Sequence, residues 1–182
     1  MKLAELKYNV EIPEGVNVDL MPNAEIKAKG KKGEVCRNFR AIGITLSKEG
    51  NKIVFSAKKA TKNEKRIMGT FEAHLKNMIE GVQNSHIYKM KICSGHFPMT
   101  VSVKGTEFSV KNFLGEKVPR TAKLQAGVTV KVEGSDVTVE SPDIEKAGAT
   151  ASRIELLMFI SKRDRRVFQD GIYITQKPGE KP

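Results

Sequence analysis

Two stretches of this 182-residue chain are nearly the same: Gly-Ile-Thr-Leu-Ser-Lys-Glu-Gly at residues 43–50 and Gly-Val-Thr-Val-Lys-Val-Glu-Gly at residues 127–134. Four of the eight positions are identical, and two more exchange Ile or Leu for Val. Upstream, residues 25–29 resemble residues 107–111 in the same order and at nearly the same offset. Chance similarity between strand–turn–strand segments is the alternative, but two ordered matches favour an internal repeat. The repeat predicts two copies of one domain.

Local patterns indicate what each copy contains. Val128, Val130 and Val132 alternate with polar residues, which is typical of a half-buried strand, and Gly134-Ser135-Asp136 follows as a hairpin turn. Thr61 and Glu64 have the spacing of a helix-capping box. In the second copy, Ser141 and Pro142 indicate a helix start. We therefore predict an α+β fold: an internal duplication of two small domains, each an antiparallel β-sheet packed with one α-helix.

The expected division of the chain has three parts. Residues 1–82 form the N-terminal α+β repeat and residues 83–162 the C-terminal α+β repeat. Residues 163–182 form a basic C-terminal extension, and four cations fall within residues 162–166, around its start.

Composition and charge limit the class of protein. The chain has 32 Lys plus Arg and 21 Asp plus Glu, a formal net charge of +11, and 39% apolar residues, too apolar and too mixed in charge for a disordered tail. No apolar run is long enough to span a membrane, the first residues lack a secretory signal, and two cysteines make no disulfide framework. Residues 27–76 alone carry a balance of +10. This excess favours a polyanionic partner over a merely solvated surface.

Motifs for enzymatic chemistry are weak. Cys93 and His96 are three residues apart, but the chain lacks the paired Cys-x-x-Cys of a zinc site. The basic stretch at residues 29–33 lacks the spacing of a triphosphate-binding loop and is interpreted as a hairpin turn. No nucleophile-elbow motif marks a catalytic triad. We therefore expect no enzyme activity, metal, cofactor, small-molecule substrate or membrane association.

Four segments together resemble a known family. They are Asn77 to Val82, then Tyr88 to Ile92 with His96 to Met99, then Asn112 to Arg120, and the run Arg-Arg-Val-Phe-Gln-Asp-Gly-Ile-Tyr-Ile at residues 165–174. In this order they are similar to the large-subunit ribosomal protein six family in its archaeal form. One departure is Leu156, where the family signature usually has Gln.

The resemblance implies a structural protein of the cytoplasmic ribosome made of two homologous α+β domains. It would bind large-subunit ribosomal RNA (rRNA), chiefly through the second domain, near the stalk base and the sarcin–ricin loop, beside other ribosomal proteins of the stalk base. A basic module that binds another polyanion or an acidic protein partner remains the alternative.

The resemblance also implies which residues face RNA. Carried over by motif position, the candidates are His96, Lys111, Asn112, Lys117, Arg120, Arg163, Arg165 and Arg166. Lys29, Lys31 and Lys32 form a weaker set in the first domain. Phe97 and Phe113 are aromatic and could stack on bases or belong to the core.

Overall fold

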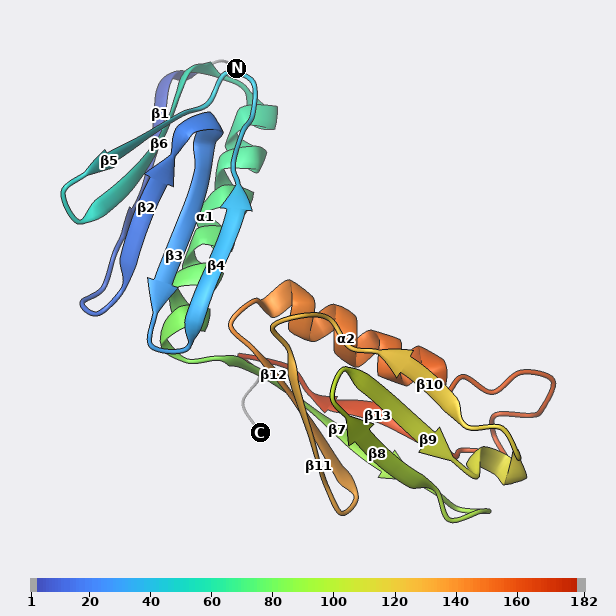
Figure 1. Ribbon diagram of the computed structural model, residues 1–182. Helices are drawn as coiled ribbons and strands as arrows, with labels where there is room; N and C mark the ends of the chain where they lie inside the picture. Colours follow the sequence, from blue (N-terminus) through green and yellow to red (C-terminus); the bar gives the residue numbers. More distant parts are fainter. Residues whose placement is uncertain (1–2, 180–182) are drawn as a thin grey trace. The chain divides into compact units, whose positions relative to one another are not determined.

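The computed structural model describes residues 3–179, and the chain divides into two compact units after Ser85 (Figure 1). Residues 1–2 and 180–182, the outer ends of the expected N-terminal repeat and C-terminal extension, lie outside the described residues. Within residues 3–179, neither helix has the length and apolar composition needed to cross a bilayer.

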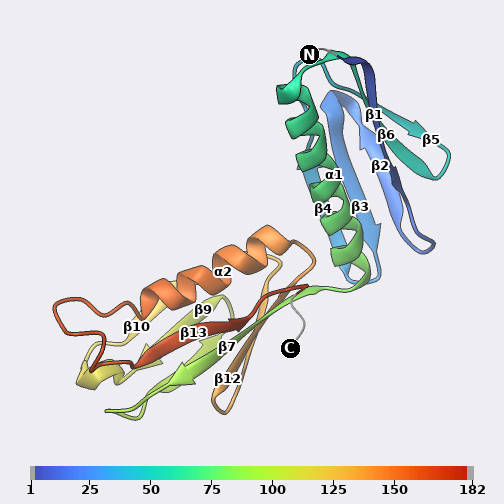
Figure 2. The ribbon, with the colours of Figure 1, turned by 180° about the vertical axis from the view of Figure 1, so that it is seen from behind.

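The first unit packs one helix against two antiparallel three-stranded sheets, ordered β1-β6-β5 and β2-β3-β4. Figures 1 and 2 show the helix α1 running along the strands of this unit. Its elements are β1 (Leu3–Glu11), β2 (Asn17–Met21), η1 (Pro22–Ala24), β3 (Glu25–Gly30), β4 (Gly33–Asn38), β5 (Thr45–Glu49), β6 (Lys52–Ala60) and α1 (Lys62–Gln83).

The second unit repeats this plan and adds one strand. Its sheets are ordered β10-β9-β8 and β11-β12-β7-β13, again antiparallel. Its elements are β7 (His86–Cys93), β8 (Thr100–Lys104), β9 (Glu107–Lys111), η2 (Phe113–Gly115), β10 (Arg120–Lys123), β11 (Thr129–Glu133), β12 (Asp136–Ser141), α2 (Ile144–Leu157) and β13 (Gly171–Gln176).

The order of elements confirms the predicted α+β duplication. In both units the first strand pairs with the sixth and the sixth with the fifth, while strands two to four form the other sheet. The strands of each copy are thus divided between two sheets rather than forming one. The 22-residue helix α1 and the 14-residue helix α2 each pack against strands of both sheets of their unit.

The structure divides the chain differently from the expected ranges. The units separate after Ser85, because α1 continues to Gln83. Residues 171–176, expected within an extension, form β13 and complete the second sheet beside β7. Ile172 is 1% exposed, so burial of this side chain holds the segment in the core of the second unit.

Capping residues set the two helix starts. Thr61 is the N-cap of α1, and the reciprocal bonds with Glu64 confirm the predicted capping box. Helix α2 begins at Ile144 rather than at Pro142, because the Asp143 carboxylate accepts a hydrogen bond from the Glu145 N–H and acts as the N-cap. The Ser141 hydroxyl instead donates to the Gly127 carbonyl at 2.9 Å, which keeps that residue in β12.

The basic β3–β4 hairpin lies against the end of α1. The backbone N–H of Lys32 donates to the Val82 carbonyl at 3.0 Å. A Cβ atom on Gly30 would lie 2.5 Å from that same carbonyl oxygen, so only glycine fits this approach. The interpretation of residues 29–33 as a hairpin turn is confirmed, since Gly30 pairs with Gly33.

Candidate nucleic-acid interface

Three loops gather at one end of the second unit. They are the β7–β8 loop (residues 94–99), the β9–β10 loop (residues 112–119) and the α2–β13 loop (residues 158–170). Figures 1 and 2 both show the connections around η2 and after α2 at the same end of this unit. The strand pairings require this, because Cys93 lies opposite Gly171 and Thr100 lies opposite Lys111. We call these residues, together with Lys111 and Arg120 at the two ends of the β9–β10 loop, the three-loop surface.

A buried carboxylate joins the first and third loops. Asp170 is 1% exposed and accepts hydrogen bonds from the Gly95 N–H at 2.6 Å, the His96 N–H at 3.3 Å and the His96 ring Nδ1 at 3.3 Å. Burial raises the pKa of Asp170, but the bonds from Gly95 and His96 outweigh this effect and hold it below its usual range. Asp170 is therefore a charged clip between segments more than 70 residues apart in sequence.

The first and second loops are joined by an amide and an aromatic ring. The Asn112 side chain donates to the Pro98 carbonyl at 3.0 Å. The Phe97 ring lies 3.6 Å from the position that a Cβ on Gly115 would take, and Gly115 has a φ of 78°. Asn112, a predicted RNA contact, thus braces the loops through its amide. Phe97 stays 43% exposed and Phe113 is buried, which resolves the choice that the sequence left open for Phe113 in favour of the core.

Arg120 joins the second and third loops. Its guanidinium donates to the Leu157 carbonyl at 2.7 Å and the Phe159 carbonyl at 3.2 Å, at the end of α2. It also forms two bonds to the Glu116 carboxylate at 2.6 and 2.8 Å, and these bonds lower the pKa of Glu116. The guanidinium carbon lies 4.4 Å from the centre of the Phe113 ring. With so many internal partners, Arg120 is positioned as a brace.

The α2–β13 loop carries the exposed cations. The Arg163 guanidinium lies 4.9 Å from the Phe168 ring centre, and that of Arg165 lies 5.0 Å from the Phe159 ring centre. Cation–π contacts of this kind hold a guanidinium in place and leave its N–H groups available. Arg166 pairs with Asp164 at 2.9 Å and remains 91% exposed at its side chain.

The structure brings eight of the predicted residues to the three-loop surface. His96, Lys111, Lys117 and the three arginines of the α2–β13 loop are exposed there. Lys29, Lys31 and Lys32 are exposed on the β3–β4 hairpin of the first unit. Asp170 lies inside the 165–174 motif, but its bracing role could not be predicted from the sequence. Its three donors belong to Gly95 and His96, in a loop that is distant along the chain.

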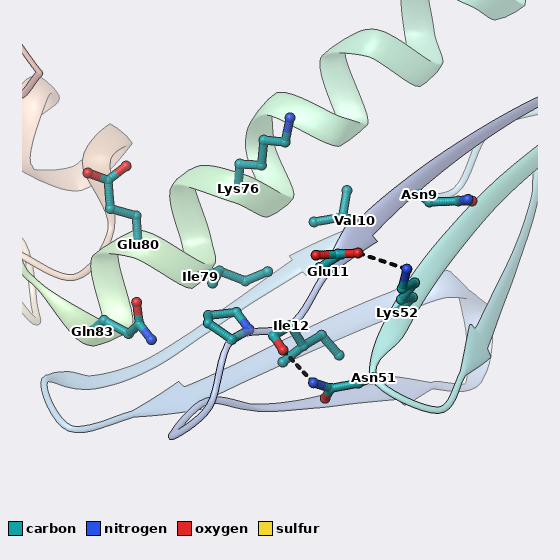
Figure 3. Close-up of a pocket in the computed structure, with 11 residues that line it drawn as sticks. Asn9, Val10, Glu11, Ile12, Asn51, Lys52, Lys76, Ile79, Glu80 and Gln83 are labelled. Atoms are coloured by element: carbon teal, nitrogen blue, oxygen red, sulfur yellow. Dashed lines mark hydrogen bonds and ion pairs between the residues drawn. The ribbon is translucent and has the colours of Figure 1, made fainter.

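A groove in the first unit has a different character (Figure 3). Its volume is about 740 Å³, and Val10, Ile12 and Ile79 contribute an apolar lining. The charged side chains around it balance, since Glu11 pairs with Lys52 at 2.7 Å and the groove also has Lys76 and Glu80. A neutral, partly apolar groove does not suit phosphate. Within residues 3–179, no group of three or more His, Cys, Asp or Glu side chains could hold a metal.

Comparison with known proteins gives the family. The model of the family described as ribosomal protein L6 matches this chain twice, at residues 12–85 and 97–171. The chain belongs to the ribosomal protein L6 family. The double match confirms the duplication, and the resemblance found in the sequence is confirmed with it. The ribosomal protein L6 family is a structural, non-enzymatic family.

Archaeal relatives in the L6 family match nearly the whole chain. The large ribosomal subunit protein uL6 of Sulfurisphaera tokodaii is 46% identical over 178 residues, which covers 97% of this chain and 95% of the relative. The uL6 protein of Nanoarchaeum equitans is 45% identical and covers 99% and 97% of the two chains. That of Aeropyrum pernix is 44% identical and covers 92% of each.

Proposed function

We propose that this protein is a structural constituent of the large ribosomal subunit and binds large-subunit rRNA through the three-loop surface. The observation that carries the proposal is the α2–β13 loop, in which Arg163 and Arg165 are held on aromatic rings and remain exposed. Membership of the ribosomal protein L6 family supports it. We further propose a position on the cytoplasmic ribosome near the stalk base and the sarcin–ricin loop, beside ribosomal proteins of the stalk base.

The arrangement suits RNA for two physical reasons. Cations that neutralise phosphates release condensed counterions, and a guanidinium can grip a phosphate with two bonds. Proteins also recognise RNA by stacking unpaired bases on aromatic rings or on Arg planes. Phe97 and Phe159 are 43% and 53% exposed among these cations, so the three-loop surface offers both kinds of contact.

The residues divide into two roles. Lys111, Lys117, Arg163, Arg165 and Arg166 are exposed and serve as the RNA contacts, with His96 at the edge of the first loop. Asn112 and Arg120 act through the loops that they join. This division makes the surface a preformed shape, which favours one RNA structure over an arbitrary polyanion.

The test neutralises the three arginines of the α2–β13 loop by Arg163→Gln, Arg165→Gln and Arg166→Gln. The matched control removes three exposed cations from strands of the same unit, by Lys91→Gln, Lys104→Gln and Lys131→Gln. Binding to a large-subunit rRNA fragment is measured from about 50 to about 200 mM salt, where each lost phosphate contact reduces the slope of log K against log salt by roughly 0.7–0.9.

The arginine variant is expected to lose affinity and about two units of slope without unfolding, because all three arginines are exposed. The control is expected to bind like the wild type. Wild-type affinity that is equal for unrelated RNA or heparin would favour the polyanion-binding alternative. Loss of thermal stability in the arginine variant would instead assign those residues to the fold.

A further inference from the structure

A second cationic surface lies on the first unit, where β6 passes into α1. Five cations fall within nine residues and all are exposed: Lys58, Lys59, Lys62, Lys65 and Arg66. We call them the junction cations. Arg66 donates to the Asn63 side chain at 2.9 Å, and within residues 3–179 the four lysine side chains form no ion pair. Elsewhere in this unit lysines pair with glutamates, as Lys27 does with Glu34 at 3.0 Å.

The backbone at Lys59 turns one of these cations outward. In β6 the side chains of Phe55 and Ala57 are buried, so regular alternation would point residue 59 toward the same core. Lys59 instead has a φ of 55°, which is uncommon outside glycine, and Ala60 takes the buried place at 1% exposure. Lys58 and Lys59 are therefore adjacent and both exposed.

The junction has little internal compensation for its charge. Lys62, Lys65 and Arg66 lie in the first turns of α1, at the end where the helix dipole is already positive. Glu64 is the one acidic residue of the segment, and its carboxylate accepts from both the N–H and the hydroxyl of Thr61 in the capping box. Glu5 lies opposite Lys58 on β1, but its carboxylate pairs with Lys7 at 3.2 Å. The nearby acidic side chains of the free protein are thus engaged with other partners than the five cations.

We propose that the junction cations form a second RNA-contact surface, which binds the phosphate backbone of large-subunit rRNA without reading its sequence. This proposal rests on the proposed function and extends it to the first unit. RNA suits the junction better than a protein partner, because the exposed large apolar residues of the chain all lie outside residues 57–71. A protein interface needs apolar or aromatic anchors at its centre, whereas phosphates need only positive charge.

The two surfaces then differ in what they supply. In the three-loop surface, rings and carboxylates hold the arginines in position, which favours discrimination between RNAs. At the junction the lysines form no ion pair with residues 3–179 and each has a long, flexible side chain, which favours affinity for any phosphate backbone. Neutralising the junction should therefore weaken binding to every RNA by a similar factor.

The experiment uses the full chain with Lys58→Gln, Lys62→Gln and Lys65→Gln. Lys59 is left unchanged so that the β6 backbone keeps its conformation. The control is again Lys91→Gln, Lys104→Gln and Lys131→Gln, which removes the same charge from the second unit. Binding is measured across salt concentration to a large-subunit rRNA transcript and to an unrelated RNA of equal length.

The junction variant is expected to lose about two units of salt slope, from roughly 0.7–0.9 per contact, and an equal factor of affinity for both RNAs. Its melting temperature should stay the same or rise, because like charges near a positive helix end are removed. A slope equal to that of the control would overturn the inference. So would poly-glutamate of matched length that competes as well as RNA, which would point to an acidic protein partner.

Failure of the inference is distinguishable from failure of the proposed function. If the wild-type protein shows no preference for large-subunit rRNA, the proposed function fails. If the wild type shows that preference and the three-loop variant loses it, but the junction variant binds like the control, only the inference fails.

Discussion

Replacement of Asp170 by Asn tests the clip between the β7–β8 and α2–β13 loops. The substitution preserves size and removes the charge of a side chain that is 1% exposed. The carboxylate accepts from the Gly95 N–H, the His96 N–H and the His96 ring. An Asn side chain offers one oxygen, so its NH₂ group would face at least one of these donors. In the variant, two buried N–H donors would therefore face each other, with no acceptor between them.

The size of the effect follows from these bonds. A hydrogen bond to a charged group contributes about 1.5–3 kcal/mol, and a buried donor left unsatisfied costs about 1–3 kcal/mol. Since the 2.6 Å bond from Gly95 is the shortest of the three, its loss should dominate. We expect Asp170→Asn to destabilise the second unit by about 2–4 kcal/mol, or roughly 10–20 °C in melting temperature for a domain of this size.

The pH dependence gives a second readout with a definite sign. The folded-state pKa of Asp170 is held below its usual range, so the stabilisation is fully present above the unfolded-state pKa of about 3.9. It is lost as the pH falls through the lower folded-state pKa. The difference in melting temperature between the wild type and Asp170→Asn should therefore be constant near neutral pH and shrink below about pH 4.

Thermal unfolding followed by circular dichroism measures both effects. Asp164→Asn is the control, because Asp164 is an exposed carboxylate of the same loop with a pKa lowered by Arg166. Its replacement should change the melting temperature much less. Equal melting temperatures for the wild type and Asp170→Asn at pH 7 would show that Asp170 does not stabilise the second unit. A difference in melting temperature that persists unchanged to pH 3 would show that its charge is not the cause.

Three further substitutions test the packing around the hairpin, the interior of α1 and the Arg120 brace. Gly30→Ala should destabilise the first unit by about 1–3 kcal/mol, because its Cβ would lie 2.5 Å from the Val82 carbonyl oxygen. Gly69→Ala should stabilise the same unit by about 0.5–1 kcal/mol, because Gly69 lies within α1 and a Cβ there would meet open space. Urea unfolding measures both, and effects of the same sign would contradict this account. Arg120→Lys should lower the stability of the second unit by about 1–3 kcal/mol, since a lysine cannot donate to the Leu157 carbonyl and to Glu116 together. If this variant is as stable as the wild type, Arg120 is not a brace and its guanidinium is free to contact RNA.

Local features of the fold could be predicted from the sequence. The repeat predicted two α+β copies, and the Thr61–Glu64 capping box and the turn at Gly134 and Ser135 were placed correctly. These features depend on residues close in sequence. Strand β13 was missed because its pairing partner β7 lies about 80 residues earlier and because the cations before it suggested an extension.

The roles within the candidate site were harder to predict. Asn112 and Arg120 are predicted RNA contacts, and that prediction stays open. Their hydrogen bonds to the Pro98 and Leu157 carbonyls could not be predicted, because only the fold brings these groups near. Summed charge was also a coarse guide, since residues 27–76 hold most of the excess while the three-loop surface lies in the less basic second unit. Residues 27–76 carry a net charge of +10, and the five junction cations at residues 58–66 equal half of it. Glu64 is the one acidic residue among them.

We propose that the three-loop surface holds this protein on the large subunit. Sedimentation of purified large subunits through a high-salt gradient tests it most directly. We expect the wild type and the Lys91, Lys104 and Lys131 control variant to stay with the large subunit, and the Arg163, Arg165 and Arg166 variant to be released. Wild-type protein absent from the large-subunit fractions, or an arginine variant retained as well as the control, would contradict it.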